Sequence, residues 1–151
     1  MVVWRICRRA QQALDGEGAR IHGGRWNTDG VGVAYTSSSL SLAALEVLVH
    51  LEPLIMPDDL VALQIEVPDR PREFAYADAD RLPSDWRDYP APDWATELGD
   101  TWIKEGAFLC LGVPSSVIPS EYNILINPAH DGMRSVRVMS SRAFSFDTRL
   151  I

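Results

Sequence analysis

The apolar and polar residues of this chain are grouped in short segments whose spacing is typical of strands more often than of helices. Most of these segments end at or next to glycine, proline, asparagine or serine, as strands that end in turns do. The strands predicted in this way are residues 2–7, 19–26, 32–37, 60–67, 107–113 and 122–126, with further antiparallel strands in the tail 135–150. No βαβ rhythm is visible. The pattern predicts an α+β fold in a single domain spanning residues 1–151.

Two segments have the signals of helices. Ser39 is a good N-cap for the run from Leu40 to Leu51, which is rich in leucine and alanine and which Pro53 should stop. The second helix is predicted at residues 92–105, with Pro92 suited to its first turn and Gly106 to its end.

Composition and charge limit the classes of function. The chain has 151 residues, of which 46% are hydrophobic, and a chain of this length buries about 70% of its unfolded surface. Its net charge of -7 argues against direct binding of nucleic acid and against binding to anionic lipid. The excess of acid lies in residues 51–106, which sum to -9, whereas each flank sums to +1. Seven of the ten prolines also lie there, so we expect a looped, solvated segment without catalytic residues.

The positions of cysteine, histidine and apolar residues bear on the cellular compartment, on membrane spans and on metal sites. Cys7 and Cys110 lie in separate apolar runs, which predicts buried, reduced thiols and so a reducing compartment, the cytoplasm. No apolar run is long enough for a membrane helix. His22, His50 and His130 lie in three different elements without the spacing of ligands, so no metal site is predicted.

Glu46 is the first candidate functional residue. On the predicted helix its neighbours are Leu42, Ala43, Val49 and His50, so its carboxylate should be partly buried. Partial burial of a charge requires a partner or changes the pKa of the group. Two interpretations follow: an internal ion pair, with an arginine or with His50, or a functional acid.

Arg25 and Tyr35 are the next candidates. Two glycines precede Arg25, so the backbone can approach a ligand closely and the guanidinium can grip a pyrophosphate. The alternative is a kinked strand with an exposed arginine. Tyr35 lies on a predicted strand, where a tyrosine commonly fills the core with its hydroxyl hydrogen-bonded. Ser115 and Asn127 lie where strands meet loops, as binding residues and ordinary turn residues both do.

Taken in order, five motifs resemble the RES domain family, which is named for an Arg, a Glu and a Ser. The matching residues are Arg25, Glu46 and Ser115. The resemblance extends over nearly the whole chain, from Trp4-Arg5 onward, apart from the acidic middle. The motifs are His22-Gly-Gly-Arg-Trp-Asn27, Val33-Ala-Tyr-Thr-Ser37, Leu42-Ala-Ala-Leu-Glu-Val-Leu-Val-His50, Val113-Pro-Ser115 and Asn127-Pro-Ala-His130.

The resemblance implies a fold similar to the ADP-ribosyltransferases, with a split β core around an NAD cleft. It also implies a toxin of a bacterial toxin–antitoxin module, neutralised by an Xre-type helix-turn-helix antitoxin. Family members deplete NAD by hydrolysis or phosphorolysis, or transfer ADP-ribose to a protein. NAD is then a substrate and not a cofactor, and the oligomeric state is left open.

The resemblance also assigns roles to the candidates. Glu46 would stabilise the oxocarbenium cation that forms when the nicotinamide–ribose bond breaks. Arg25 would fork the pyrophosphate, and Tyr35 would stack on or hydrogen-bond the nicotinamide ribose. Ser115 would bond a phosphate or orient the acceptor, and Asn127 would make a polar contact. These residues support an NAD-cleaving enzyme, with a mono-ADP-ribosyltransferase as one alternative. The other is an inactive partner-binding domain in which Arg25 and Glu46 form a buried ion pair.

Overall fold

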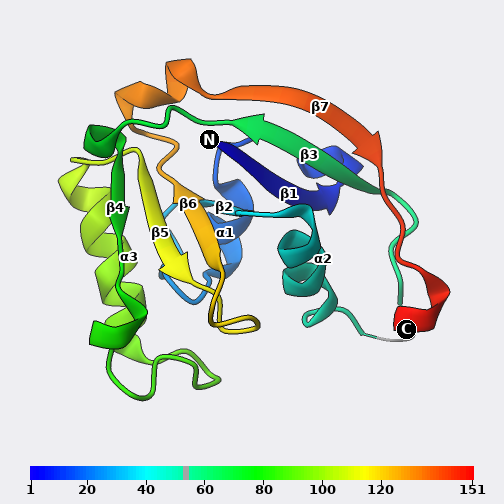
Figure 1. Cartoon of the computed structure of the whole chain (residues 1–151), viewed down its shortest axis with the longest axis horizontal. Coiled ribbons are helices and arrows are strands. Elements are labelled where there is room, and N and C mark those ends of the chain that lie inside the picture. The colour runs from blue at the N-terminus through cyan, green and yellow to red at the C-terminus, as the bar shows by residue number, and fades with distance from the viewer. Residues whose placement is uncertain (53–54) are drawn as a thin grey trace.

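A seven-stranded mixed sheet forms the centre of the molecule (Figure 1), in the computed structural model that describes residues 1–52 and 55–151. The strand order is β4-β5-β6-β2-β1-β3-β7. The strands are β1 (Val2–Arg8), β2 (Ala34–Ser37), β3 (Leu60–Glu66), β4 (Phe74–Tyr76), β5 (Cys110–Pro114), β6 (Tyr122–Ile126) and β7 (Arg137–Ala143). The helices are α1 (Glu17–His22), α2 (Leu40–Leu48) and α3 (Asp93–Glu105). The predicted α+β class is confirmed.

The sheet is almost divided between β2 and β1. These two strands share a single register pair, Trp4 with Ser37, whereas β1 pairs with β3 along its whole length. Helix α3 packs on the half made by β4, β5, β6 and β2, and α2 packs on the half that contains β1 and β3 (Figure 1). The two halves correspond to the split β core expected from the sequence.

The predicted strand at residues 19–26 is wrong. These residues form most of α1 and then a tight turn, in which Gly24 and Asn27 make an isolated bridge. Local contacts favour the helix: Asp15 accepts a hydrogen bond from the backbone N–H of Glu17, and Glu17 pairs with Arg20. Gly23, with a φ of 69°, ends the helix.

The acidic middle contains one strand that the sequence pattern did not predict. Strand β4 pairs in parallel with β5, and α3 forms the connection between them, so the chain contains a βαβ unit after all. A strand of three residues is too short to show a period of two. In the tail, β7 is a single strand, and Phe144 and Phe146 lie beyond it with their ring centroids 5.0 Å apart.

Both predicted helices are confirmed. Helix α2 begins after Ser39, whose Oγ accepts the N–H of Leu42 at 3.1 Å, and it ends three residues earlier than expected. Pro53, the expected stop, lies outside the described residues. Helix α3 follows Pro92 and ends at Gly106, which has a φ of 61°.

The two cysteines are free and buried, as predicted. Burial raises the pKa of the Cys110 thiol to about 12. Across residues 1–52 and 55–151, no helix is long and apolar enough to cross a membrane.

Candidate functional site

Glu46 lies on α2 and is half-buried, as its helical neighbours predicted. Its Oε1 accepts two hydrogen bonds, from the Ser115 hydroxyl at 2.7 Å and from the Asn123 side-chain amide at 2.6 Å. Ser115 follows the end of β5 and Asn123 lies at the start of β6, so Glu46 joins α2 to the other half of the sheet. Both donors are neutral. Of the two interpretations left open by the sequence, an ion pair of Glu46 with an arginine or with His50 is not found among the described residues, and His50 is exposed.

The two donors to Glu46 are themselves held in place. The amide oxygen of Asn123 accepts a hydrogen bond from the Ser37 hydroxyl at 2.7 Å, across the β2–β6 register. Ser115 has an exposed fraction of 0%, and its Oγ accepts the backbone N–H groups of Val117 and Ile118, both at 3.0 Å. Oε1 of Glu46 is thus bound to a fixed network, while no described residue donates a hydrogen bond to Oε2.

Replacing Ser115 by Ala is expected to lower the free energy of unfolding by about 1–3 kcal/mol. The two N–H groups that bind its Oγ would lose their acceptor in a part-buried loop, and Glu46 would lose one donor. Urea denaturation measures the change. Ser116→Ala is the matched control, because the side chain of Ser116 makes no hydrogen bond with a described residue. Equal stability of the two variants would contradict the role assigned to Ser115.

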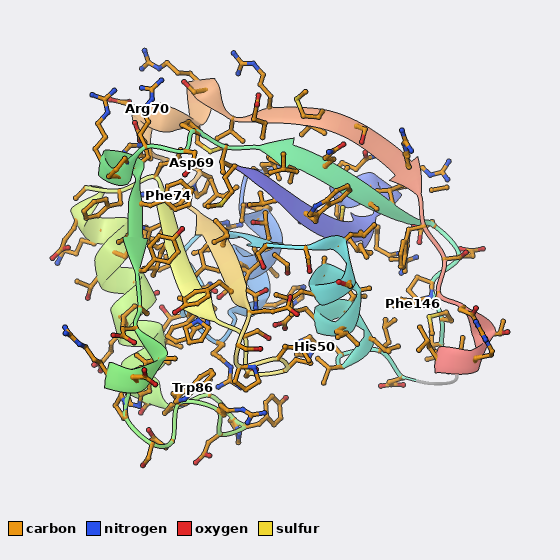
Figure 2. All side chains as sticks on the ribbon, in the orientation of Figure 1. His50, Asp69, Arg70, Phe74, Trp86 and Phe146 are labelled. Carbon is orange, nitrogen blue, oxygen red and sulfur yellow. The ribbon has the colours of Figure 1, made fainter. Side chains whose placement is uncertain are left out.

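Arg25 lies at the tip of the tight turn between Gly24 and Asn27. It is half-buried, and its Nη1 donates to the backbone carbonyls of Trp86 and Asp88, both at 2.9 Å. Burial lowers the pKa of the guanidinium, and the charges of Glu46 and Asp88 oppose that shift. Trp86 lies on the loop 82–92 below α3 (Figure 2). The acidic segment 51–106, from which no contribution was expected, therefore supplies one side of this site.

Tyr35 stabilises the turn that contains Arg25. Its hydroxyl donates to the Asn27 side-chain oxygen at 2.7 Å and accepts the backbone N–H of Trp26 at 3.1 Å. Burial raises the pKa of Tyr35, so the phenol is protonated at neutral pH. Gly24 is required here because a Cβ on it would lie 2.6 Å from the Tyr35 hydroxyl oxygen. The side-chain nitrogen of Asn27, Nδ2, donates to the backbone carbonyls of Ala19, Thr28 and Val31.

Helix α3 holds the same turn from its outer side. The Asp100 carboxylate accepts the backbone N–H of Thr28 at 3.0 Å and its hydroxyl at 2.6 Å. Gly99 lies against the backbone of Trp26, which is 2% exposed. The position of Arg25 therefore depends on the packing of α3.

Asn127 lies apart from this cluster. It follows β6 at the end opposite to Asn123, and four residues of a strand span about 13 Å. Its side-chain oxygen accepts the N–H of Ala129, and its own N–H donates to the carbonyl of Leu109. The structure thus brings Asn123, and not Asn127, to Glu46. The one available signal for Asn123 was an amide side chain inside an otherwise apolar strand.

Arg25 and Glu46 are near enough for the Glu46 charge to act on the guanidinium, but each makes its own neutral contacts. The candidate residues Arg25, Tyr35, Glu46 and Ser115 thus come from four separate segments. Arg25 and Glu46, the two charged residues among them, form no salt bridge with each other. A cavity of about 330 Å³ lies elsewhere, lined by Leu48, Leu51, Met56, Leu150 and Ile151.

Comparison with known proteins identifies the family. The model of the RES domain matches residues 2–147 of this chain. The chain belongs to the RES domain family. This RES domain is 38% identical to the "Prs ADP-ribosylating toxin" of Sphingobium sp., over 98% of the chain and 95% of that protein. It is 36% identical to "Toxin Res" of Photorhabdus laumondii, over 100% and 97%, and 36% identical to "Toxin Res" of Pseudomonas putida, over 99% of each.

A solved structure shares the fold of this RES domain. It is the crystal structure of the M. tuberculosis MbcT–MbcA toxin–antitoxin complex, with a TM-score of 0.72 over 95% of this chain and 84% of that chain. The sequence identity is 19%, so the likeness concerns the fold alone. The likeness agrees with the expected α+β fold with a split sheet.

Proposed function

We propose that this RES domain is the toxin of a bacterial toxin–antitoxin module and that it cleaves the nicotinamide–ribose bond of NAD. The observation that carries the proposal is the arrangement of Glu46, whose Oε1 is bound by Ser115 and Asn123 while Oε2 receives no hydrogen bond from a described residue. Neutral donors orient a carboxylate without cancelling its charge. A negative charge fixed in this way stabilises a developing oxocarbenium cation.

The other residues of the site take roles that their contacts allow. Nη1 of Arg25 is bound to two carbonyls, so Nη2 and Nε are the groups that would bind the diphosphate of NAD. Tyr35 would contact the nicotinamide ribose, and it also supports the Arg25 turn. Ser115 is fully buried with its hydroxyl bound to Glu46, so we assign it the positioning of Glu46 and not direct contact with a phosphate.

A mono-ADP-ribosyltransferase that modifies a protein is the second candidate function. It would break the same bond and form the same cation, but a protein side chain would attack the ribose in place of water or phosphate. The relative from Sphingobium sp., 38% identical over nearly the whole chain, is named an ADP-ribosylating toxin, and this favours the second candidate over an inactive domain.

An antitoxin is the partner that the proposal requires. The MbcT toxin, which shares the fold, was solved in complex with the antitoxin MbcA. From the resemblance we propose an Xre-type helix-turn-helix protein as the antitoxin of this chain. An adjacent reading frame for a small helix-turn-helix protein would support this, and co-purification of the two proteins would test it.

The proposed reaction is tested by incubating the purified protein with NAD and following the products by NMR. The incubation is run with and without inorganic phosphate, and again with a bacterial lysate. Free nicotinamide without a modified protein supports NAD cleavage. Transfer of ADP-ribose to a protein, seen as a mass shift, supports the second candidate. Unchanged NAD under all these conditions would contradict both enzymatic functions.

A further inference from the structure

Arg87 is an exposed arginine of the acidic segment that contacts the candidate site. It lies on the loop 82–92, and its Nε donates to the backbone carbonyl of Ser116 at 3.2 Å. Ser116 directly follows Ser115, whose hydroxyl donates to Glu46. The loop 82–92, the β5–β6 connection and the end of α2 lie at the same end of the molecule (Figure 1). Arg87 therefore joins the acidic segment to the part of the chain that positions Glu46.

Arg25 is held by the residues on either side of Arg87. Its Nη1 binds the carbonyls of Trp86 and Asp88, so three consecutive loop residues connect the two guanidiniums. Trp94, at the start of α3, holds the beginning of this loop through a 3.0 Å hydrogen bond from its indole N–H to Asp85. The same short loop thus contacts Arg25 through its backbone and the residue after Ser115 through Arg87.

Neither of these guanidiniums is in a salt bridge with a described residue, and both bind backbone carbonyls. The side-chain carboxylates of Asp88 and Glu46 act on Arg25 through their charge, without a salt bridge. Carbonyl contacts orient a guanidinium but leave its charge available to an anion. Because Nε of Arg87 is bound to Ser116, its two Nη groups are the donors that remain.

We propose that Arg87 binds the diphosphate of NAD together with Arg25. The inference rests on the function proposed above and adds a substrate-binding residue from the acidic segment. A diphosphate carries negative charge on two neighbouring groups and accepts forked hydrogen bonds from guanidiniums. Arg87 on the loop 82–92, together with Arg25 held against that loop, matches this distribution of charge better than Arg25 alone.

The test is the binding of ADP-ribose, measured by calorimetry in phosphate-free buffer, so that inorganic phosphate cannot occupy the site. Arg87→Ala is expected to weaken binding about tenfold. Arg87→Gln, which removes the charge but keeps a donor for Ser116, should weaken it similarly, and Arg87→Lys should recover part of the affinity. Arg81→Ala, which removes an exposed arginine of the same segment, should leave the affinity unchanged.

Steady-state kinetics distinguish a substrate-binding role of Arg87 from a purely structural hydrogen bond to Ser116. With the acceptor that the wild-type protein uses, Arg87→Ala should raise KM for NAD about tenfold and change kcat less than about twofold. Wild-type affinity and KM in Arg87→Ala, or a loss confined to kcat, would overturn the assignment of Arg87 alone. A wild-type protein that neither cleaves NAD nor binds ADP-ribose would overturn the proposed function as well.

Discussion

Replacing Glu46 by Gln is expected to lower the rate of NAD cleavage by a factor on the order of 10²–10³. An amide has no charge to stabilise the oxocarbenium cation, so the loss should appear in kcat. Glutamine keeps a side-chain oxygen that can accept the hydrogen bonds of Ser115 and Asn123, so the variant should remain folded. Nicotinamide release measured with saturating NAD gives the change in kcat.

Glu52→Gln is the matched control, because Glu52 is an exposed carboxylate that follows the same helix. Its substitution changes the net charge equally and should leave the rate unchanged. Circular dichroism and thermal melting establish that both variants are folded. A folded Glu46→Gln protein that consumes NAD at the parent rate would show that Glu46 is not the functional acid.

Gly99→Ala is expected to destabilise the protein by about 1–3 kcal/mol and to reduce NAD cleavage. A Cβ at this position would lie 1.7 Å from the carbonyl oxygen of Trp26, so either α3 or the Arg25 turn must move. The expected sign is opposite to the usual one, because replacing glycine by alanine inside a helix ordinarily stabilises it by about 1 kcal/mol. Urea denaturation measures the stability, and NAD turnover reports the displacement of Arg25.

Gly18→Ala provides the comparison within the same chain. Gly18 lies in α1, and a Cβ there would meet nothing within 4 Å. This variant should be about as stable as the parent or more stable, and fully active. If Gly99→Ala matched Gly18→Ala in stability, the close contact between α3 and Trp26 could not be what holds the turn.

Much of the frame of the site could be predicted from local patterns. The serine cap and the leucine-rich period predicted the helix of Glu46, and they also predicted that its carboxylate would be partly buried. Local patterns failed where two kinds of signal competed. The sequence pattern predicted a strand at 19–26, but the hydrogen bond from the Glu17 N–H to Asp15 and the Glu17–Arg20 pair favour a helix followed by a turn.

The partners of the candidate residues were beyond such patterns, because they come from segments distant in the chain. Asn123 reaches Glu46 across 77 residues, and the carbonyl of Trp86 reaches Arg25 across 61. A spacing of this size contains no periodic signal. Whether Glu46 forms an internal ion pair could therefore be decided only from the folded structure.

The amino-acid sequence by itself determined the class of fold, the helix of Glu46 and the order of motifs that resembles the RES domain family. These properties depend on short-range periodicity, capping and residue order along the chain. Only the tertiary structure decided that Glu46 binds neutral donors and that the acidic segment closes one side of the site. It also showed that Gly99 lies against the backbone of Trp26, the residue after Arg25. The physical reason is that these contacts arise when distant segments pack, and packing geometry is a property of the whole fold.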